Sequence, residues 1–110
     1  MNGVLVCSGE YEKKNIGDYI QSVAQEQFFD KVDCYVEREH VNDYKSSETT
    51  NLIMNAWWMW HPENFPPSEC INPLSVSFHI VPSIAVRLLR PEVVRYLKKY
   101  EPIGARDYST

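Results

Sequence analysis

The sequence has few glycines, few cysteines and no cluster of either, and these shortages exclude several kinds of site. Its four glycines are too scattered to form a Gly-x-Gly-x-x-Gly dinucleotide motif or a phosphate-binding P-loop. The three cysteines include no Cys-x-x-Cys pair, which argues against a zinc ribbon or a redox motif. There is no Gly-x-Ser-x-Gly elbow for an acyl nucleophile. We therefore expect no metal and no cofactor.

Positive charge and long apolar runs are also scarce. Lys+Arg number 11 against 15 for Asp+Glu, which gives a formal net charge of -4. Compact nucleic-acid binders usually have the opposite balance, so we expect no nucleic acid as a partner. No apolar run approaches the roughly 20 residues that span a membrane. The first residues also lack the basic region of a secretory signal. These features predict a cytoplasmic protein with reduced thiols and no transmembrane segment.

The 110 residues are 44% hydrophobic and 24% charged, which is typical of one globular domain. Short apolar runs and alternating segments predict about five β-strands. These strands are expected at Gly3–Ser8, Val32–Glu37, Asn51–Asn55, Leu74–Ile80 and Ile103–Ala105. A polar loop is expected over Glu10–Gly17, and Ala56–Pro73 is expected to be a long ordered loop. Its proline density excludes a regular helix, and its three tryptophans are expected to be buried.

Three helices are expected between these strands. The first runs from Asp18, its predicted N-cap, to about Phe29. Its apolar residues recur at helical spacing, and we expect this face to pack on the sheet: Ile20, Val23, Ala24 and Phe28. The second helix is predicted from a cap at Ser83 to Leu89. The third begins at Pro91, and its expected inner face consists of Val93, Val94 and Leu97.

The strand–helix–strand start implies a parallel pair with a right-handed crossover. We therefore predict a Rossmann-like α/β three-layer sandwich with a mainly parallel sheet of about five strands, in the order 3-2-1-4-5. In such sheets, ligands bind beyond the carboxyl ends of the strands. Eight residues follow these ends or open the first helix, and they are the predicted binding residues: Asn15, Gly17, Asp18, Asn55, Trp57, His79, Arg106 and Asp107.

Five of these residues are expected to share one concave surface: Asn15, Asp18, Asn55, His79 and Arg106. Asp18, His79 and Arg106 are candidates for catalytic groups, although the sequence assigns no acid or base. Each residue also has a structural interpretation. The first loop is consistent with a turn and a helix cap. His79 is consistent with a half-buried structural histidine, and the tryptophan-rich run with core packing.

Four short motifs follow one another along the chain, and their order is informative. They are Asn-x-Gly-Asp from Asn15, Asn-Ala-Trp-Trp from Asn55, Ser-Phe-His from Ser77, and Gly-Ala-Arg-Asp from Gly104 followed by Ser-Thr. As an ordered set they resemble the N-terminal half of the polysaccharide pyruvyl transferase family over nearly the whole chain. The resemblance implies a GT-B-like architecture with two Rossmann-like domains. It also implies transfer of the enolpyruvyl group of phosphoenolpyruvate to two hydroxyls of a sugar, which leaves a pyruvate ketal on a surface polysaccharide.

The resemblance further implies that residues 1–110 are a single domain and the N-terminal fragment of a longer bacterial protein. This half is expected to form the acceptor side of the cleft, and its partner there is a glycan or sugar. Phosphoenolpyruvate is expected to be held mainly by the missing C-terminal domain, so this chain alone is expected to be inactive. The alternative is a non-catalytic glycan-binding or structural α/β domain.

Overall fold

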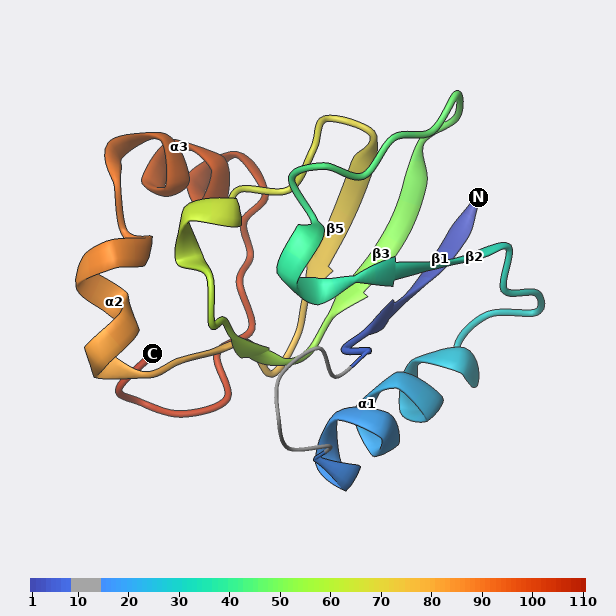
Figure 1. The fold of residues 1–110 in the computed structure, drawn as a ribbon, viewed down its shortest axis with the longest axis horizontal. Coiled ribbons are helices and arrows are strands. Elements are labelled where there is room, and N and C mark those ends of the chain that lie inside the picture. Colours follow the sequence, from blue (N-terminus) through green and yellow to red (C-terminus); the bar gives the residue numbers. More distant parts are fainter. Residues whose placement is uncertain (9–14) are drawn as a thin grey trace.

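Four parallel strands form the main sheet in the computed structural model, which describes residues 1–8 and 15–110. The strands are β1 (Asn2–Val6), β2 (Cys34–Glu37), β3 (Thr50–Met54) and β5 (Ile71–Ser75). Their order across the sheet is β2-β1-β3-β5 (Figure 1). A second, two-stranded parallel sheet pairs β4 (Trp57–Trp58) with β6 (His79–Ile80). The α/β class with a parallel sheet is thus confirmed, with four strands in the main sheet.

Two of the five predicted strands differ in the structure. The strand expected at Leu74–Ile80 is divided, because β5 ends at Ser75 and β6 covers only two residues. The expected fifth strand is reduced to an isolated parallel bridge between Phe78 and Ala105. Most of the expected polar loop, residues 9–14, lies outside the described residues.

The predicted strand order is also wrong, because β3 lies directly beside β1. The register pairs Asn2 with Asn51 and Gly3 with Leu52. Strand β1 is therefore central, and its buried Val4 and Leu5 lie between β2 and β3. Glycine is needed at position 3, since an added Cβ would lie 2.8 Å from Cγ2 of Thr50.

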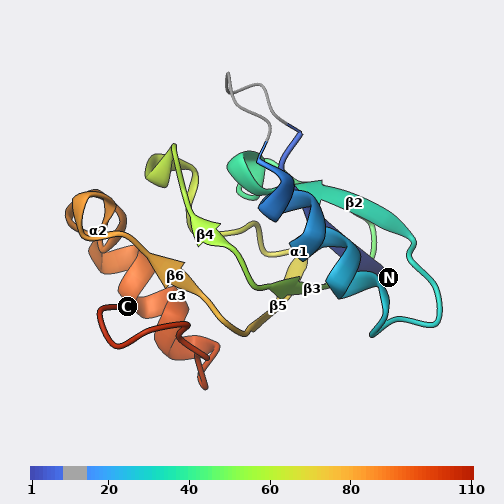
Figure 2. The same cartoon turned by 90° about the horizontal axis from the view of Figure 1, so that it is seen from below.

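The helices are α1 (Ile16–Glu26), α2 (Pro82–Leu88) and α3 (Pro91–Lys99). Two short 3₁₀ helices, η1 (Arg38–His40) and η2 (Pro62–Asn64), follow β2 and β4. Helix α1 lies along one face of the main sheet, whereas α2 and α3 lie together at the other end of the molecule, beside β6 (Figures 1 and 2). None of the described helices is long and apolar enough to cross a membrane.

Two predicted caps are wrong. The side chain of Asn15 caps α1 by accepting from the N–H of Gly17 at 2.9 Å, so Asp18 lies inside the first turn. Helix α2 begins at Pro82 without a side-chain cap, and Ser83 is already helical. Proline replaces the cap there because its missing N–H leaves one donor fewer to satisfy.

The face of α1 that packs on the sheet is polar, contrary to the prediction. Ile20, Val23 and Phe28 are 61%, 65% and 73% exposed. The inward side chains are Ser22 and Gln25. Ser22 donates to the carbonyl of Leu5 at 2.7 Å, and the side-chain oxygen of Gln25 accepts from the N–H of Leu5 at 2.8 Å. Pairing of β1 with β3 stops at Gly3, so the backbone of Leu5 needs side-chain partners. This requirement places polar side chains on the inside of the helix.

The core centres on aromatic residues beside the second sheet. The ring of Trp58 stacks on Phe78 with centroids 5.3 Å apart and meets the edge of Phe65 at 5.7 Å. All three residues are buried, whereas Trp60 is 54% exposed, so the expectation that every tryptophan is buried is wrong for Trp60. On α3, Val93 is buried and Leu97 packs against the core, but Val94 is exposed.

Candidate functional site

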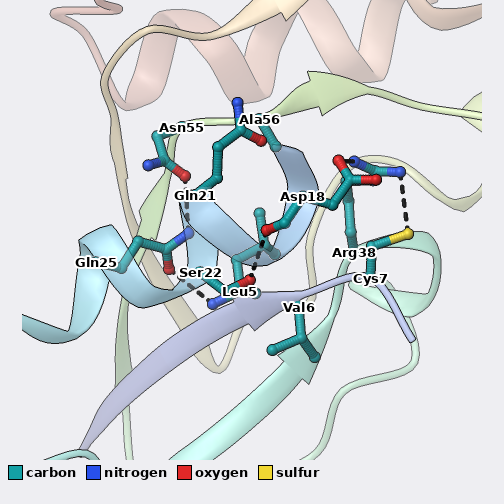
Figure 3. A pocket seen from close by; sticks show the side chains of 10 residues that line it. All are labelled: Leu5, Val6, Cys7, Asp18, Gln21, Ser22, Gln25, Arg38, Asn55 and Ala56. Carbon is teal, nitrogen blue, oxygen red and sulfur yellow. Dashed lines mark hydrogen bonds and ion pairs between the residues drawn. The ribbon is translucent and has the colours of Figure 1, made fainter. Parts of the chain in front are cut away.

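A pocket lies at the carboxyl end of the main sheet, where β1 and β3 separate. From β1 the chain passes to β2 on one side and then crosses back over β1 to β3 on the other side. The gap between β1 and β3 is therefore the topological switch point of the sheet. The switch point is where open parallel sheets usually bind ligands. Ten residues line the pocket (Figure 3): Leu5, Val6, Cys7, Asp18, Gln21, Ser22, Gln25, Arg38, Asn55 and Ala56.

An amide pair closes one side of this pocket. Gln25 is buried, and its Nε2 donates to Oδ1 of Asn55 at 2.7 Å. Because the oxygen of Gln25 accepts from Leu5, the orientation of this amide is fixed at both atoms. The contact in turn fixes the amide of Asn55, which comes from the end of β3 (Figure 3).

A buried arginine forms the opposite side. The guanidinium of Arg38 donates from Nη1 to Oδ1 of Asp18 at 3.1 Å and from Nε to Oε1 of Glu39 at 3.3 Å. Its Nη2 donates to Sγ of Cys7 at 3.2 Å. The side chain of Arg38 is only 2% exposed. One cation thus contacts two carboxylates, so the three charges sum to -1.

The second carboxylate, Glu39, connects the pocket to the tryptophan-rich segment. Glu39 is fully buried and accepts from the backbone N–H groups of Trp60 and His61, both at 3.0 Å. The ring of Trp57 lies 5.5 Å from Cζ of Arg38, and the Trp57 and Trp60 centroids are 4.7 Å apart. Two tryptophan rings therefore lie next to the charged side of the pocket.

Arg38 and Glu39 were not predicted as site residues. They follow β2 directly, so the rule that polar residues gather beyond the carboxyl ends of strands also applies to them. The predicted site covers the ends of the other strands and leaves out the end of Val32–Glu37. The signal was therefore present in the sequence.

A second polar group surrounds Asp107. Its Oδ2 lies 2.5 Å from Nδ1 of His79 and 3.8 Å from Nε of Arg106. Its Oδ1 accepts from Ser109 and Thr110. Hydrogen bonds from Ser109, and then from Thr110 and His79, hold the pKa of Asp107 far below its ordinary value.

The structure places the predicted site residues in two adjoining groups. Asp18 and Asn55 line the pocket, and Asn15 and Gly17 form the cap that begins α1. The second group comprises Trp57, His79, Arg106 and Asp107. Ala56 joins the two groups, because it lines the pocket and its carbonyl accepts from the N–H of His79 at 3.2 Å.

Comparisons of the chain with family models, curated proteins and solved structures find no match. Over residues 1–8 and 15–110, no three His, Cys, Asp or Glu side chains gather as a metal site would require.

Proposed function

We propose that this chain is the acceptor-side domain of a polysaccharide pyruvyl transferase. In this proposal it is the Rossmann-like, N-terminal half of a two-domain, GT-B-like enzyme of the cytoplasm. The enzyme adds two sugar hydroxyls to the enolpyruvyl group of phosphoenolpyruvate, releases phosphate and leaves a pyruvate ketal on a surface polysaccharide. The pocket at the switch point binds the sugar, and the second domain holds most of the donor.

The charge of the pocket is the observation that carries this assignment. Phosphoenolpyruvate has a phosphate and a carboxylate, so its site needs several cations that are not already neutralised. The guanidinium of Arg38 is shared between Asp18 and Glu39, and the sum of the three charges is -1. Among the described residues, Arg38 is the one cation that lines the pocket, and its charge is already neutralised, which disfavours an anionic donor. The pocket suits a neutral ligand whose hydroxyls donate to the carboxylate of Asp18 and accept from the amide of Asn55.

The tryptophan pair supports the same ligand class. Trp60 is half exposed and lies against Trp57, whose ring contacts Arg38 on the pocket side. An exposed aromatic face offers an apolar surface for the C–H groups of a sugar ring, while polar groups nearby fix its hydroxyls. The combination of amides, a carboxylate and an aromatic face is what a polyhydroxylated ligand needs.

The size of the pocket fits one side of a cleft. Its volume is only about 10 Å³, room for about one water molecule and far below the roughly 300–1,000 Å³ of pockets that surround a drug-sized ligand. A single sugar ring would therefore lie across the mouth of the pocket and not inside it. In this proposal the second domain covers the rest of the sugar ring.

The test is a titration of the ¹⁵N-labelled chain with methyl α-D-glucopyranoside, whose 4- and 6-hydroxyls are free. We expect saturable shifts of the side-chain amides of Asn55 and Gln21. Asp18→Asn and Asn55→Asp keep the oxygens that accept from Arg38 and Gln25, so these variants should fold and bind more weakly. Asn72→Asp, on the exposed opposite end of the sheet, is the matched control and should bind normally.

Methyl galactoside and methyl mannoside serve as further probes, because the family resemblance names no particular sugar. The assignment fails if none of the three sugars shifts the pocket amides. Equal shifts in the wild type and in both pocket variants would place the ligand elsewhere, for example on the tryptophan pair alone. That outcome would favour the glycan-binding module without transferase chemistry.

A further inference from the structure

The side chains of His79 and Trp57 lie on the same side of the two-stranded sheet. The register of β4 and β6 pairs Trp57 with His79 and Trp58 with Ile80. Paired residues of neighbouring strands point to the same face, and successive residues point to opposite faces. Trp58 and Ile80 are buried on the core side, so the imidazole and the Trp57 ring share the other side. The Trp57–Trp60 pair lies on that side, and the guanidinium of Arg38 lies over the Trp57 ring.

The hydrogen bonds around His79 determine its tautomer. Nδ1 lies 2.5 Å from Oδ2 of Asp107, which can only accept, and 3.2 Å from Oγ1 of Thr110. That hydroxyl donates its proton to Oδ1 of Asp107 at 3.0 Å, so it also offers Nδ1 only a lone pair. Nδ1 therefore carries a hydrogen, and in the neutral ring Nε2 has the free lone pair.

The carboxylate of Asp107 is itself held in place. Its Oδ1 accepts from the N–H and the hydroxyl of Ser109 and from the N–H and the hydroxyl of Thr110, at 2.6–3.1 Å. Oδ2 is left to face His79 and Arg106. A carboxylate that orients an imidazole through Nδ1 and leaves Nε2 as a base is a recurring arrangement in proton-transfer sites.

We propose that Nε2 of His79 is the proton acceptor for the sugar hydroxyl that attacks the pyruvyl donor, and that Asp107 is its positioning residue. This inference rests on the proposed function and adds to it the group that performs the first proton transfer. The hydroxyl oxygen forms a bond to C2 of phosphoenolpyruvate while its proton moves to Nε2. The π electron pair of the C2=C3 bond forms a new C–H bond at C3 with the proton that His79 releases. The hydroxyl is thus added across the double bond, and the imidazole returns to its neutral form.

The first test measures the free lone pair directly, without requiring turnover. Diethyl pyrocarbonate acylates an unprotonated imidazole nitrogen, and mass spectrometry separates the peptides of His79 from those of His40 and His61. In Asp107→Asn, the amide oxygen still accepts from Ser109 and Thr110, while its NH₂ group donates to Nδ1 and moves the ring hydrogen to Nε2. We expect acylation of His79 to slow by about tenfold or more, as expected for the wrong tautomer, while His40 and His61 react at unchanged rates.

Thr110→Val is the matched control, because it removes the hydroxyl and leaves Oδ2 of Asp107 beside Nδ1. If Asp107 sets the tautomer, this variant keeps a fast-reacting His79. The alternative is that the contacts of Asp107 and Thr110 only hold residues 107–110 against β6. In that case Thr110→Val accelerates acylation of His79 and Asp107→Asn has no effect, which overturns the proposal. Long-range ¹H–¹⁵N spectra provide an independent readout, since the wild type should show the Nδ1–H form and Asp107→Asn the Nε2–H form.

The same reaction with added methyl α-D-glucopyranoside separates this inference from the proposed function. Protection of His79 by the sugar is expected if both hold. Sugar binding at Asn55 without protection of His79 leaves the acceptor pocket in place and overturns the role of His79. Absence of sugar binding together with a tenfold effect of Asp107→Asn overturns the proposed function alone, because the oriented base is then present without its expected substrate.

Discussion

Replacing Arg38 by methionine should cost more stability than any other single change at the pocket. The guanidinium is 2% exposed, and its neighbour Glu39 is fully buried. Methionine keeps much of the side-chain volume but leaves the carboxylate of Glu39 without its cation. Removing one partner of a buried ion pair costs about 3–5 kcal/mol, because an uncompensated charge remains inside the protein. Domains of this size have about 5–15 kcal/mol of total stability, so the variant should fold but be marginal.

Urea unfolding followed by tryptophan fluorescence measures this loss. For a slope of about 1–3 kcal/mol/M, the expected loss lowers the midpoint by roughly 2 M at an unchanged slope. Arg87→Met is the matched control, because the Arg87–Glu63 pair is more than half exposed on both sides, and its midpoint should not change.

The double variant Arg38→Met/Glu39→Gln provides the decisive comparison. Glutamine carries no charge, but its single oxygen can accept from only one of the two N–H groups, that of Trp60 or that of His61, so only part of the lost stability should return. The reasoning is refuted if Arg38→Met unfolds at the wild-type midpoint. It is also refuted if Glu39→Gln adds a full further loss to that of Arg38→Met, since the two side chains would then act independently.

Three further outcomes follow from the same contacts. Trp58→Ala should lose about 3–5 kcal/mol in thermal unfolding, because it opens a cavity between two buried aromatic rings, whereas Trp60→Ala should leave the melting temperature unchanged. Gln25→Ala should lower the free energy of unfolding in urea by about 1–3 kcal/mol, since it leaves the buried N–H of Leu5 without its acceptor. An unchanged free energy would mean that β1 and β3 can pair with each other at this point. Asp107 has a lowered pKa, so its contribution to stability is complete above the ordinary pKa of aspartate and declines as the pH falls below it. The difference in midpoint between the wild type and Asp107→Ala should thus be smaller at pH 2 than at pH 7, and a constant difference would contradict the assigned charge.

The parts of the fold that follow from local pattern could be predicted, and those that depend on neighbouring strands could not. The apolar run around Val4 and Leu5 indicated a buried strand, and Pro91 marked the start of a helix. The face of α1 was predicted wrongly because apolar spacing alone places Ile20 and Val23 inside. The inward face is set instead by the backbone of Leu5, whose unpaired groups require Ser22 and Gln25.

The same limit applies to the candidate site. Strand ends indicated Asp18 and Asn55 correctly as neighbours, because they depend only on the position of β1, β3 and α1. That Arg38 lies between two carboxylates depends on how β2 ends against α1, which no local pattern expresses. The contact of His79 with Asp107 joins residues 28 positions apart and needs the bridge between Phe78 and Ala105 to form.

The central claim is that this chain binds the neutral acceptor and not the anionic donor. Calorimetric titration of the chain with phosphoenolpyruvate and, separately, with methyl α-D-glucopyranoside tests it most directly. We predict saturable binding of the sugar. Because Asp18 and Glu39 already neutralise Arg38, we predict binding of phosphoenolpyruvate no tighter than about millimolar, roughly -4 kcal/mol. Micromolar binding of phosphoenolpyruvate with no binding of the sugar would contradict the account, because the donor site would then lie in this domain.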